Sequence, residues 1–401
     1  MRPRLEHEIE TRACKALAAI RSVHGASVVR AHVDLTPHRY GRGMRWGLVI
    51  ALVLLGAIAI VGALVHRPGK PNAVSTTSTN KPKPDPNRIV ALRGPLPGGL
   101  LIADRGNDRI LLVDPRRRTL WRFPTAADRA KGRRLVFDDD TFVEPGGKAL
   151  VTNEEENHDI LSINIKTHAV TNLYGHPGVK GSAPGLLNTP DDAYVLPDGT
   201  TTVADAYNCR ILFIRRHRIV RQIGRTAVCV HDPPRTLGGV NGDTPLRGGG
   251  VLVSEVSGSW IDRFSKTGRL LWSFRAPVSY PSDPQPLPGG RILLADYASP
   301  GAVVILNHHG RVLWRYGPAS GWGALDHPSL AIMLPNGNIA INDDYNDRVV
   351  VVDPRRRRIV WQYGHRARPG RGGTFLRIPD GMDYIPLGVH EKPLWQLVHH
   401  P

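Results

Sequence analysis

Cysteine and aromatic residues are scarce in this chain of 401 residues, which has three cysteines and 6% aromatics. Three cysteines exclude a disulfide-rich scaffold. The sequence also lacks a nucleophile elbow, a P-loop, a dinucleotide-binding glycine pattern and zinc-ligand spacing. The enzyme classes that depend on those motifs are therefore excluded.

Glycine and proline are abundant, with 42 and 34 residues. Both interrupt helices and mark turns, so a helical bundle is excluded. Hydrophobic residues make up 41% of the chain, enough for a large core. The length fits two or three ordinary domains or one large β assembly. The net charge of +18 by itself suggests nucleic-acid binding. Whether it does so depends on where along the chain the basic residues lie.

Long hydrophobic runs are limited to one, residues 46–65, which are apolar or small and carry no charge. Twenty helical residues rise about 30 Å, the thickness of a bilayer core, so this run predicts a transmembrane helix. The 45 residues before it include nine Lys/Arg, against five in residues 66–88. This asymmetry favours a cytoplasmic N-terminus and an extracytoplasmic C-terminal region at the cell membrane.

The segments around this span have different predicted roles. Residues 1–45 form a basic cytoplasmic arm, and residues 66–88, rich in Pro, Ser, Thr and Lys, form a disordered linker. About half of the excess positive charge flanks the span, where it sets topology. Nucleic acid is therefore not an expected partner.

Residues beyond 88 repeat at intervals of about 46 residues. Each unit has a Pro-Gly or Asp/Asn-Gly turn, an apolar strand, a polar turn, a Val/Ile/Leu strand, a basic turn and a final strand. Such a period with four short strands predicts propeller blades. The expected fold is all-β, a six-bladed β-propeller of four-stranded antiparallel blades over residues 89–388, followed by a C-terminal tail, 389–401.

Two repeated motifs resemble known families. The pattern D-x-[GY]-N-x-R occurs as Asp104-Asn107-Arg109, Asp205-Asn208-Arg210 and Asp343-Asn346-Arg348. It resembles the NHL repeat, which implies a six-bladed propeller. The strand endings at 117–123, 268–274, 310–316 and 357–363 resemble the Trp-containing ending of pyrroloquinoline-quinone (PQQ)-type repeats. The chain thus looks like a membrane-anchored bacterial propeller protein, a resemblance that specifies fold rather than function.

Ring closure has two possible routes. The segment 378–388 matches the inner-strand segment 189–199, so the C-terminus is expected to pair with the first blade. Residues 89–95 compete for the same place, and a seventh, incomplete blade is a further alternative.

Basic residues gather at the predicted turns between the third and fourth strands, which share one face of the ring. Among them are Arg116, Arg117, Arg118, Arg215, Arg216, Arg355, Arg356, Arg357 and Arg358. These arginines are either ordinary solvated turn residues or a docking surface for an anionic partner such as lipid headgroups, a cell-wall polymer or an acidic protein.

The opposite face is predicted to be acidic where each second strand ends. Its candidates for a hard cation are Asp104, Asp205, Glu255, Asp296 and Asp343, with Glu154 or Asn153 in the second blade. Carboxylate oxygens suit Ca²⁺ or another divalent cation. The alternative is local, with each Asp stabilising its own turn and pairing with the Arg five residues later.

Three further aspartates, Asp191, Asp283 and Asp380, lie at the start of inner strands and are better candidates for a ligand in the central channel. The least repetitive segment, 229–246, adds His231-Asp232 as a weak candidate catalytic pair. Asn241 and Asp243 in that segment, with the nearby Trp260, complete the set of candidate ligand-binding residues.

Cys209 and Cys229 are predicted to lie on the same face of the third blade. They are either a disulfide, which suits an oxidising compartment, or two separate thiols. A disulfide closing this loop would contribute about 3 kcal/mol.

Two functions remain open. The first is a membrane-tethered extracytoplasmic module that binds a ligand or protein as a sensor or scaffold. The second is a propeller enzyme, similar to a lactonase, lyase or quinoprotein, that uses a cation or quinone on the acidic face. PQQ itself is not expected, because the tryptophans more simply brace neighbouring blades.

Overall fold

The computed structural model describes residues 88–89, 93–398 and 400. All of these residues belong to one compact unit of the chain, 80–401. The predicted arm, the predicted span at 46–65 and nearly all of the predicted linker lie outside the described residues. Within the part that is described, no helix combines the length and the apolar composition that a membrane crossing requires.

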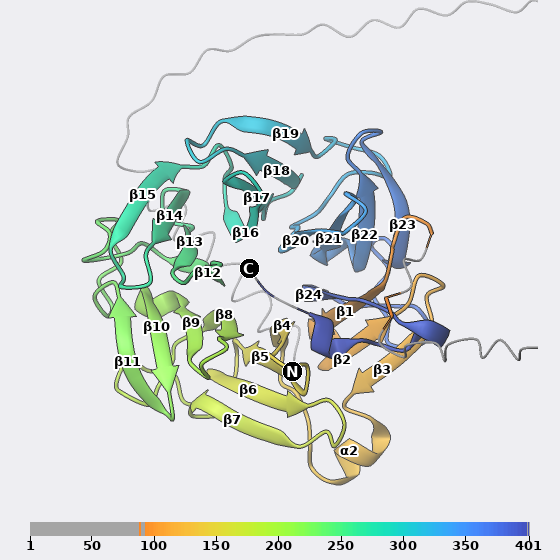
Figure 1. Ribbon diagram of the computed structural model, residues 1–401, viewed down its shortest axis with the longest axis horizontal. Coiled ribbons are helices and arrows are strands. Elements are labelled where there is room, and N and C mark those ends of the chain that lie inside the picture. The colour runs from red at the N-terminus through yellow and green to blue at the C-terminus, as the bar shows by residue number, and fades with distance from the viewer. Residues whose placement is uncertain (1–87, 90–92, 399, 401) are drawn as a thin grey trace, which may run out of the picture. The chain divides into compact units, whose positions relative to one another are not determined.

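Six four-stranded antiparallel sheets surround a central axis and form the blades of a propeller (Figure 1). From the inner to the outer strand, blades 1, 2 and 3 contain the following elements: β24 (Asp380–Ile385), β1 (Gly99–Asp104), β2 (Arg109–Val113) and β3 (Thr119–Phe123); β4 (Asp138–Val143), β5 (Ala149–Glu154), β6 (Asp159–Asn164) and β7 (Val170–Gly175); β8 (Pro190–Val195), β9 (Thr201–Asp205), β10 (Arg210–Arg215) and β11 (Arg218–Ile223).

Blades 4, 5 and 6 follow the same order: β12 (Val240–Pro245), β13 (Val251–Glu255), β14 (Trp260–Phe264) and β15 (Leu270–Arg275); β16 (Pro281–Leu287), β17 (Arg291–Asp296), β18 (Ala302–Leu306) and β19 (Val312–Tyr316); β20 (Ala331–Met333), β21 (Ile339–Asp343), β22 (Arg348–Asp353) and β23 (Arg358–Gly364). A short helix, α2 (Ala126–Ala130), connects blades 1 and 2. The predicted all-β, six-bladed, four-stranded architecture is therefore confirmed.

Burial follows the position of each strand in its blade. The second strand β1 is buried along its whole length, whereas the outer strand β11 alternates between exposed and partly buried residues up to its buried last residue, Ile223. Apolar side chains of successive blades meet between the sheets; for example, Leu293 and Val303 of blade 5 share a cluster with Ile341 and Val350 of blade 6. The core is thus a set of layers between the blades.

The ring closes through the C-terminal strand. Strand β24 pairs antiparallel with β1, so blade 1 combines the last strand of the chain with the first three (Figure 1). Residues 89 and 93–95, the described part of the competing 89–95 segment, form no strand. The six sheets account for all the strands among the described residues, so the alternative of a seventh blade is wrong.

Tryptophans of the outer strands link neighbouring blades. The indole N–H groups of Trp121, Trp314 and Trp361 each donate to a backbone carbonyl of the next blade, at Ile165, Pro354 and Pro115, with distances of 2.9, 3.0 and 2.9 Å. The bond from Trp361 joins blade 6 to blade 1, across the closure of the ring. These residues brace the propeller, as the sequence analysis favoured over a role in quinone binding.

The predicted C-terminal tail packs on the ring. It contains two single-turn helices, η4 (Val389–Glu391) and η5 (Trp395–Leu397). Trp395 packs against Trp121, with ring centroids 5.9 Å apart. The imidazole of His400 lies edge-on to Phe142, at 5.6 Å.

Candidate functional site

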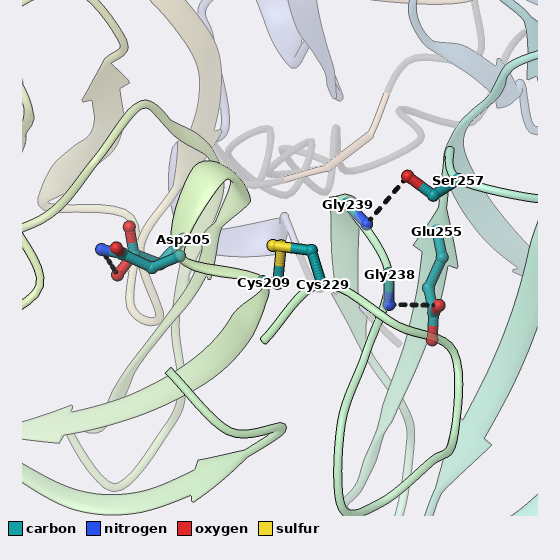
Figure 2. Close-up of a disulfide and its surroundings, with 8 residues drawn as sticks. Asp205, Cys209, Cys229, Gly238, Gly239, Glu255 and Ser257 are labelled. Carbon is teal, nitrogen blue, oxygen red and sulfur yellow. Dashed lines mark hydrogen bonds between the residues drawn. A yellow bond between two sulfur atoms is a disulfide. The ribbon is translucent and has the colours of Figure 1, made fainter. Parts of the chain in front are cut away.

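One acidic residue at the end of the second strand fastens the same connection in every blade. Its carboxylate accepts a hydrogen bond from a backbone N–H in the segment that leads into the inner strand of that blade. The pairs, with their distances, are Asp104 and Arg377 (2.7 Å), Glu154 and Val136 (2.7 Å), Asp205 and Asn188 (2.8 Å), Glu255 and Gly238 (2.5 Å), Asp296 and Ser279 (2.9 Å), and Asp343 and Asp326 (2.7 Å). We call these six residues the pin carboxylates; Figure 2 shows Glu255 and Gly238.

Asparagine and arginine complete this arrangement in blades 1, 3 and 6. In blade 3, Asn208 Nδ2 and Arg210 Nε donate to Asp205 at 2.8 and 2.7 Å. The rest of the guanidinium reaches the carbonyls of Ser182 and Leu186 in the same connection. Burial raises the pKa of Asp205, and the Arg210 charge opposes that shift.

The five metal candidates Asp104, Asp205, Glu255, Asp296 and Asp343 are all pin carboxylates. Each is held by donors of its own blade, and the structure does not gather the five at one point. The repeated geometry supports the local, structural interpretation of these residues.

The residue after each pin carboxylate is placed differently, because side chains alternate at the strand end. Arg105, Glu155 and Tyr297 occupy this position in blades 1, 2 and 5, and all three line a cavity of about 100 Å³. Its complete lining is Arg105, Asp139, Asp140, Glu155, Asp191, Asn241, Tyr280, Ser282, Asp283, Tyr297, Ser329 and Asp380. We call it the channel cavity.

Arg105 is the only basic residue among the described residues that line the channel cavity. Its guanidinium contacts Asp139 at 2.8 Å, Asp380 at 2.6 Å and also Glu155. Burial alone would lower the pKa of Arg105, but these carboxylates raise it well above its ordinary value. Burial would raise the pKa of Asp380, but the Arg105 charge lowers it. One guanidinium therefore faces three carboxylates in this half of the cavity and offsets only part of their charge.

A second group of carboxylates comes from the inner strands β4, β8 and β16. Asp140, Asp192 and Asp283 each place one carboxylate oxygen within 4.8 Å of the others, and all three are buried. One oxygen of each, Oδ1, has no hydrogen-bond partner among the described residues. Burial raises the pKa of all three well above the ordinary value, and neighbouring carboxylates raise it further. We call these residues the channel triad.

Asn241 and Asp243 on β12 connect this group to its surroundings. The Asn241 amide donates to Asp191, and its carbonyl oxygen accepts the backbone N–H of Asp283 at 3.3 Å. The backbone N–H of Asp243 donates to Asp192 Oδ2 at 3.1 Å. The Asp243 carboxylate is fully buried, and neither of its oxygens has a hydrogen-bond partner in the described structure.

The structure brings four of the predicted ligand-binding residues, Asp191, Asp283, Asp380 and Asn241, to the channel cavity. Asp243 lies beside it, through its bond to Asp192. Trp260 is not part of the cavity; its ring stacks on the imidazole of His231, with centroids 3.9 Å apart.

Five charged residues of this site were not predicted from the sequence: Arg105, Asp139, Asp140, Glu155 and Asp192. A pattern in the sequence could have found the aspartates, because DDD at 138–140 and DD at 191–192 both lie at the start of an inner strand. Arg105 and Glu155 required a rule that emerges from the structure, namely that the residue after the pin carboxylate lines the cavity in those blades.

His231 and Asp232, the candidate catalytic pair, have different hydrogen-bond and ion-pair partners. His231 Nδ1 lies 3.0 Å from Glu255 Oε2, while Asp232 is exposed and pairs with Arg235 at 2.6 Å. Neighbours in sequence diverge here because the loop turns between them. Within the described residues, His231 and Asp232 thus have separate partners, and a catalytic role for the pair stays a prediction.

Cys209 and Cys229 form a disulfide, with Cα atoms 5.3 Å apart (Figure 2). Cys209 ends the 3-10 turn η2 (Ala206–Asn208), directly after the Asp205 pin. The bond therefore ties the pin region of blade 3 to the connection that enters blade 4.

The nine arginines of the predicted basic face are all exposed at the turns between third and fourth strands. Several already have partners within the chain: Arg116 and Arg118 pair with Glu391, and Arg356 pairs with Asp353. Arg215 borders a groove of about 790 Å³ that is lined by blades 2, 3 and 4 and by the C-terminal tail, where Phe213 and Leu246 also lie.

No family model matches the sequence, and no curated protein matches it. Solved propeller structures are similar. A protein of unknown function from Bacteroides caccae is 17% identical; the match covers 71% of this chain and 97% of that chain, with a TM-score of 0.49. A chain of a nidogen–laminin complex is 14% identical, with coverages of 71% and 97% and a TM-score of 0.49. Virginiamycin B lyase from Staphylococcus aureus is 15% identical, with coverages of 56% and 69% and a TM-score of 0.41. Likeness at this level concerns the fold alone.

Proposed function

We propose that this propeller is a ligand-binding module whose channel triad holds a divalent cation. The observation that carries the proposal is the set of three buried Oδ1 atoms, on Asp140, Asp192 and Asp283, that lack hydrogen-bond partners in the described chain. Buried carboxylates are normally paired or hydrogen-bonded, because an isolated buried charge is costly. A cation supplies the missing partner for all three at once.

The chemistry of the donors indicates the kind of cation. Asp140, Asp192 and Asp283 offer only oxygen, the ligand that Ca²⁺ and Mg²⁺ prefer. Three aspartates from three separate blades, together with the uncompensated Asp243, favour Ca²⁺, which accepts six to eight oxygens in irregular geometry. Mg²⁺ demands a more regular octahedron.

The position of the triad leaves a place for a ligand. Asp140 and Asp283 line the channel cavity, so a cation held by them borders that cavity. An oxygen of a small ligand would complete the cation's coordination, and Arg105 and Tyr297 in the same cavity would contact the rest of it. The ligand class that fits is an oxygen-rich small molecule or side chain.

We also propose that the module is tethered to a membrane by residues 46–65, with the propeller outside the cytoplasm. The Cys209–Cys229 disulfide supports an oxidising compartment. The exposed arginine face supports an anionic partner or surface. Reporter fusions placed after residue 88 test the orientation, and a cytoplasmic reporter would overturn it.

Thermal melting of the full chain, purified in detergent, tests the cation site. Added Ca²⁺ should raise the melting temperature of the wild type after EDTA treatment, because a ligand that binds only the folded state stabilises it. Asp192→Asn should remove most of this rise. Asp198→Asn is the matched control: Asp198 lies in the same blade, but its side chain is 59% exposed, at a turn.

A further inference from the structure

Another group of metal-ligand atoms lies in blade 4 and the connection that enters it, outside the channel cavity. His231, Glu255 and Asp262 place one ligand atom each within 4.8 Å of one another. None of the three belongs to the lining of the channel cavity. The site does not depend on the cation proposed for the channel triad.

Blade 4 departs from the pin arrangement of blades 1, 3 and 6. In blade 6, Arg348 Nε donates to the pin carboxylate Asp343 at 2.6 Å. In blade 4, Glu255 is the pin, and Trp260 stands where the arginine would be. The imidazole of His231 takes the place of the guanidinium, with Nδ1 3.0 Å from Glu255 Oε2.

Asp262 adds a second carboxylate beside the pin, which blades 1, 3 and 6 lack and which Asp159 supplies in blade 2. It lies on β14, and its Oδ2 is 4.0 Å from His231 Nδ1. Both Asp262 oxygens and Glu255 Oε1 are buried, and no described residue hydrogen-bonds to them. One imidazole therefore faces two buried carboxylates, where an arginine faces one in blades 1, 3 and 6.

The two separations measured from His231 fit a single metal ion. Zinc forms bonds of about 2.0–2.2 Å to histidine nitrogen and carboxylate oxygen, so two ligands of one ion lie at most about 4.2 Å apart. The distances from His231 Nδ1 to Glu255 and Asp262, 3.0 and 4.0 Å, fall within this limit. A set of one imidazole and two carboxylates suits Zn²⁺ and similar transition metals better than Ca²⁺.

Neighbouring contacts hold the histidine in this orientation. Its ring stacks on Trp260 with planes 4° apart, and Nε2 lies 3.5 Å from the Ser273 hydroxyl. The disulfide anchors Cys229, two residues before His231 (Figure 2). The imidazole remains 19% exposed, which leaves a route for an ion from solvent.

We propose that His231, Glu255 and Asp262 form a binding site for a transition-metal dication of the Zn²⁺ class. In this site the ion takes over the charge compensation that arginine provides in blades 1, 3 and 6. It also fixes the connection between blades 3 and 4, because His231 belongs to that connection and Glu255 and Asp262 belong to blade 4.

Titration of the full chain, purified in detergent without a histidine tag, with Zn²⁺ alone tests the proposal. The chain has 17 histidines, and others among them can also bind zinc. The quantity compared is therefore the zinc affinity that is lost in variants of this site. Asp262→Asn and His231→Gln should each weaken that site at least tenfold. Asp232→Asn is the matched control, because Asp232 is adjacent to His231 but pairs with Arg235, and it should leave zinc binding unchanged.

Two results would overturn the proposal. One is zinc binding that both Asp262→Asn and His231→Gln leave intact, which would mean that the imidazole acts only as a proton-bearing partner of Glu255. The other is an equal loss in Asp232→Asn. Circular dichroism establishes that each variant is folded. Zinc should also raise the melting temperature of the wild type but not that of either site variant, whereas Asp192→Asn should keep the zinc response.

Discussion

Asp192 Oδ2 accepts the backbone N–H of Asp243 at 3.1 Å, while Asp192 Oδ1 has no hydrogen-bond partner in the described chain. The first contact joins the inner strands of blades 3 and 4. The unpartnered oxygen belongs to the channel triad, whose third-blade member is thus held in place by its neighbour. One oxygen of this carboxylate is held by a hydrogen bond, and the other is available as a ligand for a cation.

The pin arrangement should be essential for stability. Arg348→Gln removes a fully buried guanidinium that contacts Asp343 and two carbonyls of the preceding connection. We expect the free energy of unfolding to fall by about 3–5 kcal/mol, because a buried carboxylate loses its partner. Chemical denaturation measures this change.

Arg356→Gln is the control for that prediction. Arg356 also pairs with an aspartate, Asp353, but its side chain is 66% exposed. The expected loss is below about 1 kcal/mol. Equal losses in the two variants would contradict a structural role for the pins.

Blade 2 should make stability depend on pH. Burial, and then the neighbouring Asp159, raise the pKa of Glu154 to about 8. The unfolded chain releases this proton near pH 4–5, whereas the folded chain keeps it until about pH 8. Stability from this residue is therefore full at low pH and is lost as the pH rises toward 8.

Glu154→Gln tests that dependence, because glutamine retains an oxygen that can accept the N–H of Val136. Between pH 5 and pH 8, in EDTA, the variant should lose less stability than the wild type. The difference in slope should approach about 1.4 kcal/mol per pH unit, the value for one proton. Parallel curves would show that Glu154 does not titrate in this range.

The disulfide should stabilise the connection between blades 3 and 4. Replacing both Cys209 and Cys229 by alanine opens a loop with a sequence separation of 20. The expected loss in the free energy of unfolding is about 3 kcal/mol in the chain-entropy model. Reductant should lower the free energy of unfolding of the wild type and leave that of the double variant unchanged. This difference would show that the Cys209–Cys229 bond is responsible. A wild type insensitive to reductant would contradict it.

The sequence predicts the propeller because each blade repeats the same local pattern of a turn, a buried strand and a pin carboxylate. The pairing of Asp205 with Arg210 is also local, so spacing alone suggests it. The channel triad is different, since Asp140, Asp192 and Asp283 come from three blades and meet only when the ring closes. Their spacing in the sequence does not predict that these three side chains lie close together.

His231 shows that residues adjacent in the sequence need not have side chains that contact each other. Adjacency to Asp232 suggested a dyad, yet the connection turns His231 toward Glu255 and Asp262 and leaves Asp232 in solvent. Side chains of loop neighbours diverge with the backbone, and the sequence does not record that direction. The candidate functional residues are therefore brought together by contacts between blades and connections rather than by motifs.

Calorimetric titration of Ca²⁺ into the EDTA-treated full chain, purified in detergent, tests the central claim most directly. We predict one Ca²⁺ per chain in the wild type and in the Asp198→Asn control. Asp192→Asn and Asp283→Asn should weaken binding at least tenfold, or about 1.4 kcal/mol. A wild type that binds no Ca²⁺, or binding that both triad variants retain, would contradict the account.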